Sequence, residues 1–330
     1  MATQLLLTLG FQTEEKAVIR LVEWETQKTL RQLDYHSPVS AFLDRLRVHH
    51  PEKVPAEYIT PKCKFSGGSF WGNHFYTCTF NEVVRVNLPE WSVDHYFTKK
   101  TFNDLHYVHV EASGIYVCNT GLDVVEHFDH DFNFIEMFPM MSENFQQKFP
   151  AGVDYRYEPK IIGRESHPNQ ILNHQGKLLV NCPVRRCLAN LSDNKPVIEG
   201  FTEMFHDGIL RNGHYYFSCI DSQIVVVSAE TLKIVDQHDL RKFYGSNAPG
   251  WCRGLEVIDD FAFVGFSRLR MPSKPNYLKQ ALLGTKNLDS HVLCYDLKNR
   301  KILTDWVFGT EIIYGIYEYT ADVGREKQNE

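Results

Sequence analysis

Three observations in this 330-residue sequence predict an all-β fold of repeated sheets closed into a ring. An apolar strand, a tight polar turn and a second strand recur along the chain, with apolar and polar residues alternating in each copy. Another strand pair, joined at Gly or Asp, precedes most of these hairpins. The segment 312–319, IIYGIYEY, is one more strand with no neighbour in sequence. Together these features predict a six-bladed β-propeller.

The recurring hairpins supply the two outer strands of each blade. Their turns lie near residues 25, 89, 130, 192, 230 and 298. The spacings from 89 to 130 and from 192 to 230 are close to the ~40 residues of a four-stranded blade. The other spacings fit a blade with roughly 25 inserted residues.

The inner strand pairs come before hairpins two to six. They are expected at 67–78, 108–119, 172–182, 209–219 and 255–266. The first hairpin lacks an innermost strand, so we expect segment 312–319 to pair with the amino-terminal strand and close the ring, because closure removes exposed sheet edges. This predicts a single propeller domain over residues 1–320, no long helix, and a frayed polar tail over 321–330.

Three insertions, about 36–62, 139–165 and 268–290, are expected on one face of the ring. All three fall in connections on the side where the innermost strands begin, which we call the top face. Long loops on one side of a rigid scaffold commonly carry binding function. The insertion 139–165 is rich in Phe, Met and Tyr, and is expected to be a lid or a packed surface element.

Composition narrows the classes of partner. The net charge of −6 and the pI near 6.2 disfavour nucleic acid and anionic membranes, which attract basic proteins. No apolar run approaches the ~18 residues of a membrane span, and the amino terminus lacks a signal pattern, so a cytoplasmic location is expected. The eight cysteines mostly lie in apolar strand-like runs and are expected to be buried, reduced thiols.

The residues that open the innermost strands should line the top of the channel. His106, His167 and His206 open three consecutive blades at similar distances before the next turn, with His109 as the alternative to His106. Three converging imidazoles can hold one divalent transition metal ion (Zn, Fe, Cu, Mn or Ni) with an open position for substrate. Without metal they can act as general acid and base, with Asp207 orienting His206. The structural alternative is hydrogen bonding to backbone or channel water.

Arginines are expected on the same face. Arg253 opens the innermost strand of blade six, Arg185 and Arg186 lie in a turn of blade four, and Arg268 and Arg270 end a strand of blade six. Guanidinium groups bind carboxylates and phosphates in paired geometry, so a small anionic molecule is the expected guest. The main hypothesis is an enzyme acting on such a metabolite, with hydrolase, lyase, cyclase and oxidoreductase chemistry all open. The alternative is a non-catalytic ligand- or protein-binding propeller.

The last blade also carries a resemblance. The stretch GWCRGLEV at 250–257 is followed by FVGFSRLR at 263–270 and HVLCYDL at 291–297. This resembles an uncharacterised bacterial family of six-bladed propellers with an RGL…VGxSxxR signature, over about residues 166–320. The resemblance implies the fold and no assigned reaction. More distantly, the chain is similar to the strictosidine synthase and gluconolactonase propellers, but it lacks the Glu/Asn/Asp metal set of gluconolactonases.

Overall fold

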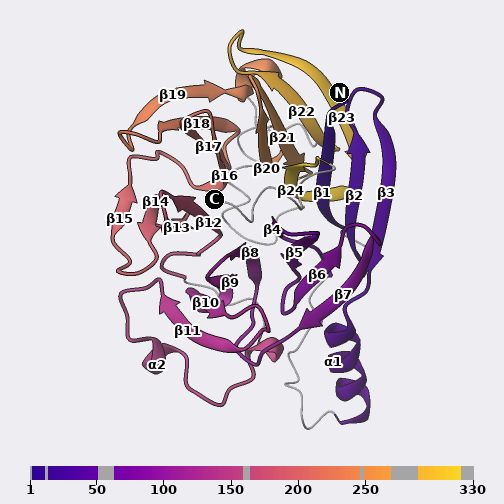
Figure 1. Ribbon diagram of the computed structural model, residues 1–330, viewed down its shortest axis with the longest axis vertical. Coiled ribbons are helices and arrows are strands. Elements are labelled where there is room, and N and C mark those ends of the chain that lie inside the picture. The colour runs from indigo at the N-terminus through magenta and orange to yellow at the C-terminus, as the bar shows by residue number, and fades with distance from the viewer. Residues whose placement is uncertain are drawn as a thin grey trace.

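The computed structural model describes residues 2–11, 14–50, 63–158, 164–245, 249–268 and 289–320. Their strands form six antiparallel four-stranded sheets, arranged as the blades of a propeller (Figure 1). The predicted fold class, a six-bladed β-propeller, is therefore confirmed.

Each blade is built outward from the axis, from its innermost strand to the rim. Blade 1 contains β24 (Glu311–Glu318), β1 (Gln4–Phe11), β2 (Ala17–Glu23) and β3 (Lys28–Tyr35); blade 2 contains β4 (Gly68–Trp71), β5 (His74–Cys78), β6 (Val83–Asn87) and β7 (Ser92–Phe97); blade 3 contains β8 (Leu105–Glu111), β9 (Gly114–Asn119), β10 (Val124–Phe128) and β11 (Phe134–Pro139). Blade 4 contains β12 (Gln170–His174), β13 (Lys177–Cys182), β14 (Cys187–Asn190) and β15 (Pro196–Ile198); blade 5 contains β16 (Phe205–Arg211), β17 (His214–Cys219), β18 (Gln223–Ser228) and β19 (Ile234–Asp239); blade 6 contains β20 (Trp251–Ile258), β21 (Phe261–Ser267), β22 (Ser290–Asp296) and β23 (Lys301–Gly309).

Pairing of the two ends of the chain closes the ring, as predicted. β24 runs antiparallel to β1, from Leu5 opposite Glu318 to Phe11 opposite Glu311. Arg20 of β2 donates two hydrogen bonds of 2.6 Å to the Glu311 carboxylate. The amino-terminal strand therefore has a neighbour on both sides, and blade 1 has no exposed inner edge.

The core lies between the blades. Every residue of β9 and β10 is buried, whereas β3 and β11 at the rim are mostly exposed. Alternating side chains of the middle strands point to both neighbouring blades, and six hydrophobic clusters each join two adjacent blades. This packing gives the inner strands a rigid support, and the residues at their ends inherit fixed positions.

The first predicted insertion contains a helix that the sequence analysis did not expect, α1 (Pro38–His49). The Ser37 hydroxyl accepts a hydrogen bond of 2.9 Å from the Ser40 N–H, and Pro38 occupies the first turn. Val39 and Leu43 are the buried residues of the helix, which lies at the rim of the molecule in Figure 1. With only two buried apolar positions, its helical period is weak.

The second predicted insertion is a packed surface element. It contains the short helix α2 (Phe145–Lys148) and the 3-10 turn η3 (Tyr155–Tyr157). Met141, Phe149 and Tyr155 pack on Leu122 in one hydrophobic cluster. Residues 159–163 of this insertion, most of the third insertion and the predicted tail 321–330 lie outside the described residues.

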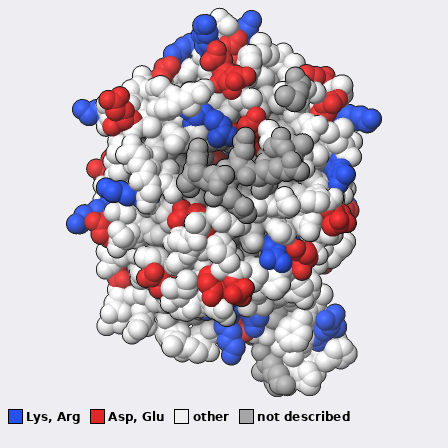
Figure 2. All heavy atoms as spheres, viewed as in Figure 1, with Lys and Arg blue, Asp and Glu red and all other residues white. Residues whose placement is uncertain are grey.

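All eight cysteines are buried and none forms a disulfide, as expected from their apolar surroundings. Of the described helices, none has the length and apolar character to cross a bilayer. Acidic and basic side chains are interspersed on the face shown in Figure 2.

Candidate functional site

Near the start of the innermost strand β8 the backbone contains one extra residue. Leu105 pairs with Asn119 of β9. Tyr107 pairs with Cys118, the very next residue of β9, so His106 is the extra residue between them. This is a β-bulge, which bends the strand and changes the direction of the side chain.

Equivalent bulges occur in the other blades. The extra residue is His206 in β16 and Tyr314 in β24, and in β20 the pair Arg253 and Gly254 lies opposite the single residue Gly265. In blade 4, Gln170 pairs with Asn181 of β13, and the N–H of Asn169 donates to the carbonyl of the same Asn181. Asn169 is therefore the extra residue of this blade. In blade 2, Gly67 is extra because its two neighbours bond to successive residues of β5. We call this set the bulge ring: Tyr314, Gly67, His106, Asn169, His206 and Arg253, in blade order.

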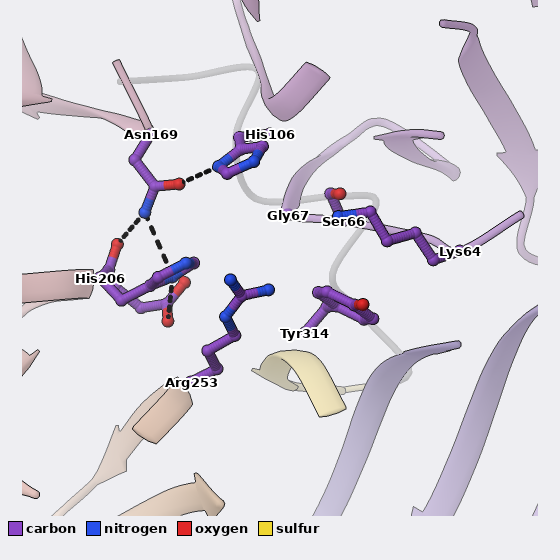
Figure 3. A pocket seen from close by; sticks show the side chains of 9 residues that line it. Lys64, Ser66, Gly67, His106, Asn169, His206, Arg253 and Tyr314 are labelled. Carbon is purple, nitrogen blue, oxygen red and sulfur yellow. Dashed lines mark hydrogen bonds and ion pairs between the residues drawn. The ribbon is translucent and has the colours of Figure 1, made fainter. Parts of the chain in front are cut away.

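The bulge ring surrounds a small cavity, into which the labelled side chains of Figure 3 converge. Lys64, Ser66 and Asp207 complete its lining. The cavity measures about 10 Å³, room for one water-sized group. One backbone feature, repeated in each blade, therefore brings residues from all six blades to one point.

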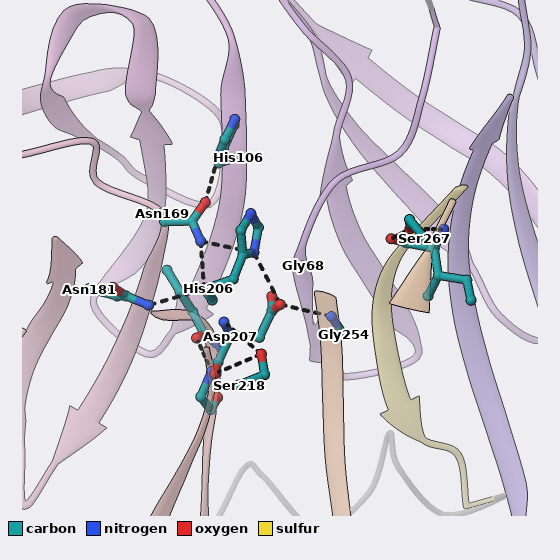
Figure 4. Close-up of polar contacts among 12 residues, drawn as sticks. Gly68, His106, Asn169, Asn181, His206, Asp207, Ser218, Gly254 and Ser267 are labelled. Carbon is teal, nitrogen blue, oxygen red and sulfur yellow. Dashed lines mark hydrogen bonds and ion pairs between the residues drawn. The ribbon is translucent and has the colours of Figure 1, made fainter. Parts of the chain in front are cut away.

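Asn169 connects the two histidines of the bulge ring. Its side-chain oxygen accepts a hydrogen bond of 2.5 Å from Nδ1 of His106, and its amide group donates to the backbone carbonyl of His206 at 2.5 Å (Figure 4). Asn181 donates to the same carbonyl at 3.0 Å. The rings of His106 and His206 lie 6.1 Å apart and are nearly parallel. The amide thus fixes both imidazoles, and it holds the Nδ1 proton of His106.

His206 and Asp207 form a hydrogen-bonded pair. Nδ1 of His206 lies 3.1 Å from Oδ2 of Asp207, which also accepts a bond of 2.8 Å from the Gly254 N–H. The Asn169 amide nitrogen, which only donates, also lies 3.1 Å from this Nδ1. The ionised Asp207 carboxylate only accepts and makes the stronger, charge-assisted bond, so the imidazole proton is assigned to Nδ1 and the lone pair to Nε2. No described residue makes a hydrogen bond to that Nε2, although it is buried. It is the one ring nitrogen of His206 that can take a proton from a guest.

The electrostatic surroundings keep this pair as a neutral imidazole and a carboxylate. Burial and the nearby Arg253 cation lower the pKa of His206, and Asp207 only partly opposes them. Burial raises the pKa of Asp207, but His206, the Gly254 N–H and Arg253 together bring it below the ordinary value. A neutral imidazole beside a carboxylate is the resting state required of a general base.

Two cations stand opposite this pair. The Arg253 guanidinium lies 5.1 Å from the Tyr314 ring centre and the Lys64 ammonium lies 4.7 Å from it, so the ring faces both. Of the residues the structure describes, none hydrogen-bonds to the buried Nε of Arg253. With Asp207 as the one acid among the lining residues, the cavity lining carries a net charge of +1 when His is neutral. This favours an anionic guest.

His167 does not occupy the position that its spacing suggested. It precedes β12, and Asn169, two residues later, is the member of the bulge ring. The His167 N–H donates to Oδ1 of Asp123 at 2.7 Å, and Arg164 donates to its Nδ1 at 2.8 Å. Its ring centre lies 4.8 Å from that of His106, so it packs behind the cavity and does not line it. The expected equivalence of the three histidines is thus correct for His106 and His206 only.

Three other predicted arginines are described by the structure, and none of them lines this cavity. Arg185 donates hydrogen bonds to the side chain and backbone carbonyl of Asn194. Arg186 is exposed in the turn before β14. Arg268 forms an ion pair of 3.4 Å with Asp289, and Arg270 lies outside the described residues. Of the four predicted arginines that the structure describes, Arg253 alone lies with the histidines.

Five lining residues were not predicted from the sequence: Lys64, Ser66, Gly67, Asn169 and Tyr314. In blade 4 the prediction chose His167, two positions before Asn169 in the same segment. Tyr314 lies in an apolar strand and resembles a core aromatic residue, and Lys64 precedes blade 2 without any motif. No residue type marks Asn169 or Tyr314, because the bulge that directs each of them to the cavity arises from the pairing of two strands.

Within the described residues, no three His, Cys, Asp or Glu side chains are grouped so that they could hold a metal ion. Asn169 engages Nδ1 of His106, and Arg164 engages Nδ1 of His167. The two cations beside the cavity also oppose binding of a third.

No protein-family model and no curated protein matches this chain. A chain of the crystal structure of a nidogen/laminin complex aligns with a TM-score of 0.57 and 11% identity, covering 95% of this chain and 97% of that chain. The dihydro-heme d1 dehydrogenase NirN in complex with DHE aligns with a TM-score of 0.44 and 10% identity, over 97% of this chain and 75% of that one. The second alignment is too weak to support an argument. The first shows that this chain shares the β-propeller fold, and the fold alone.

Proposed function

We propose that the protein is an enzyme that binds a small anionic metabolite at the bulge ring and transfers a proton with His206. The observation that carries this proposal is the arrangement inside one cavity: the cations Arg253 and Lys64 lie opposite the His206–Asp207 pair. An anion anchor beside a neutral, oriented imidazole is the combination that general acid–base catalysis on a carboxylate or phosphate compound requires.

Each residue has a separate role in this proposal. Arg253 and Lys64 bind the carboxylate or phosphate of the guest, with Arg253 offering paired donors. Nε2 of His206 accepts the proton, and Asp207 stabilises the imidazolium that forms. Asn169 fixes the ring of His106 beside the cavity, where it forms part of the wall around the guest. Isomerisation, elimination and hydrolysis of small anions are reactions that this set can catalyse.

A metal centre on His106, His167 and His206 is the less favoured form of the proposal, because His167 packs outside the cavity and two cations stand beside it. Elemental analysis of the purified protein after incubation with Zn, Fe, Cu, Mn or Ni salts tests it. We expect less than about 0.1 equivalent of bound metal at this site. If the wild type binds one equivalent of metal and a folded variant with all three histidines changed to Ala binds none, the metal-dependent hypothesis would be supported.

A non-catalytic anion-binding propeller is the second candidate. The observation that favours it is the size of the cavity, about 10 Å³, which admits a carboxylate oxygen or a water more readily than a whole substrate. In that case, the histidines serve only to orient hydrogen bonds around the anion.

Proton exchange separates the two candidates. Small 2-oxo and 2-hydroxy carboxylates and phosphate esters are incubated with the protein in D₂O, and loss of their C–H signals is followed by NMR. We expect exchange with at least one compound, and a ~10²–10⁴-fold slower rate in His206→Gln, because the base is lost. His130→Gln, at an exposed position outside the cavity, is the matched control.

The comparison of binding with exchange decides the outcome. If the compounds bind and none exchanges, the non-catalytic candidate replaces the enzyme. Exchange that persists in His206→Gln assigns the base to another residue.

Two further proposals concern the family of this chain and its cellular location. The RGL segment at 253–255 and the bulge at Arg253 coincide, which supports membership of the uncharacterised bacterial propeller family with that signature. Eight buried cysteines without a disulfide support a reducing, cytoplasmic location.

A further inference from the structure

A second, larger cavity lies further along the axis from the bulge ring. Its volume is about 410 Å³, within the range of small-molecule sites. Residues from β4, β8, β12, β16, β20 and β24 line it, mostly one to five positions beyond the bulge ring in each strand. We call it the lower cavity, since it lies toward the ends of the innermost strands.

The lower cavity has the opposite charge from the bulge ring. Among its lining residues, Glu256 and Glu318 are acidic and Arg211 is basic, which gives a net charge of −1 with His109 neutral and both carboxyl groups ionised. Glu111 adds a further carboxylate just outside, where it accepts a hydrogen bond of 3.0 Å from Asn173 of the lining. A guest in this cavity therefore meets a negative field.

The single arginine of the lining is already engaged. Its Nε donates to the Val257 carbonyl at 3.1 Å and its Nη1 to the Leu210 carbonyl at 3.2 Å. Its Nη2 donates to Oε1 of Glu256 at 3.2 Å. Arg211 is thus held in the wall, and it is poorly placed to bind an anion. Glu318, 3.6 Å from Arg211 and about one-third exposed, keeps acceptor capacity for a guest.

Part of the remaining wall is apolar. Phe70, Leu172, Ile209, Leu255 and Ile316 line the cavity together with polar residues that include Ser69, Tyr107 and Gln170. An apolar wall beside an accessible carboxylate suits a molecule with an apolar body and one charged end.

We propose that the lower cavity binds a small organic amine, with its ammonium group at the Glu318 carboxylate and its apolar body along the strand residues. Arg211 and the buried Glu256 offset each other's charge, which leaves Glu318 as the accessible anion. This inference does not rest on the anionic function of the bulge ring, because the two cavities have different linings and opposite charges.

The protonation state of Glu256 sets the pH for the test. Burial, with a smaller contribution from Glu318, raises the pKa of Glu256 to about 7, although Arg211 and the Val257 and Glu318 N–H groups partly oppose the rise. His109 is the other titratable group of the lining, and it lies 3.5 Å from Glu111. The carboxylate form of Glu256, which binds an ammonium group best, therefore prevails above pH 7.

Isothermal titration calorimetry with three ligands of equal length tests the proposal on the full chain at pH 8. The ligands are n-hexylamine, n-hexanol and n-hexanoate. We expect the amine to bind at least ~10-fold more tightly than the alcohol, because a charge-assisted hydrogen bond is worth more than a neutral one, and hexanoate to bind most weakly. No binding of hexylamine, or equal binding of the alcohol, would overturn the proposal.

Variants assign the binding to this cavity. Glu318→Gln should weaken hexylamine binding by ~10-fold, and Glu256→Gln should weaken it less, because Glu256 is buried and paired with Arg211. Glu90→Gln removes the same charge from an exposed turn between β6 and β7 and should leave the affinity unchanged. Arg253→Ala should also leave it unchanged, so failure of the bulge-ring function is distinguishable from failure here. Unaltered affinity in both glutamate variants would contradict the assignment.

Discussion

Glu256 is a single carboxyl buried in the wall of the lower cavity, with 3% of its surface exposed. Its oxygens accept hydrogen bonds from the N–H groups of Val257 and Glu318 and from Arg211. Burial still outweighs these bonds and raises its pKa to about 7 from the ordinary 4.5. The folded protein therefore holds the proton of the Glu256 carboxyl more tightly than the unfolded chain does.

The stability of the protein should reflect this carboxyl. Because the folded pKa is the higher one, the stabilising contribution is complete below pH 4.5 and is lost as the pH rises through 7. The difference corresponds to about 3 kcal/mol of unfolding free energy. Urea denaturation at pH 5 and pH 8 measures it. We expect the wild type to lose about 3 kcal/mol relative to Glu256→Gln between these pH values. Parallel curves for the two proteins would show that the carboxyl ionises normally.

Single residues were partly predictable from the sequence. His106, His206 and Arg253 stand out because polar residues interrupt otherwise apolar strands, and the structure places all three in the bulge ring. Asn169 and Tyr314 do not stand out, since their role depends on the extra residue in the strand and not on side-chain type. The same limit explains His167, which matches the spacing pattern and lies outside the ring.

The β-bulge is the element that makes the site, and its effect depends on glycine. Gly265 of β21 lies opposite the bulge that carries Arg253, and a Cβ there would lie 2.2 Å from the Arg253 carbonyl oxygen. The neighbouring backbone can approach this closely only because Gly265 has no side chain. The position of the Arg253 guanidinium is thus coupled to a glycine on another strand.

Gly265→Ala should therefore displace Arg253. We expect a loss of about 1–3 kcal/mol of stability from the backbone shift, together with weaker anion binding at the bulge ring. Thermal denaturation and anion titration measure the two effects. Ala262→Gly, on the same strand and fully buried, is the control that lowers stability without touching the bulge. If Gly265→Ala loses no more anion affinity than this control, the coupling is absent.

The hairpins and strands were predicted better than the helix α1 and the β-bulges. Hairpin turns and alternating strands have strong local signals, so all six outer hairpins were located from the sequence. The helix α1 was missed because only Val39 and Leu43 are buried, although Ser37 and Pro38 carry a helix-start signal. Bulges have no residue signature of their own here, because they arise from the pairing of two strands.

At the scale of the whole molecule, the propeller places two cavities of opposite charge on one axis. Ring closure by β24 and β1 brings Tyr314 to the bulge ring and Glu318 to the lower cavity, so both sites need the two ends of the chain to meet. The sequence predicted this closure, because an unpaired strand near one end fits a blade that lacks its innermost strand. It did not predict the charge polarity, which depends on which residues face the axis.

The central claim is that the bulge ring binds an anion through Arg253, and a calorimetric titration tests it most directly. Acetate and inorganic phosphate are titrated into the wild type, Arg253→Ala and Arg186→Ala, the last an exposed arginine outside the cavity. We expect one anion to bind the wild type and Arg186→Ala alike, and to bind Arg253→Ala ~10–100-fold more weakly, since a guanidinium–anion contact is worth about 1.5–3 kcal/mol. Equal affinity in all three proteins, or no binding of either anion, would contradict the account.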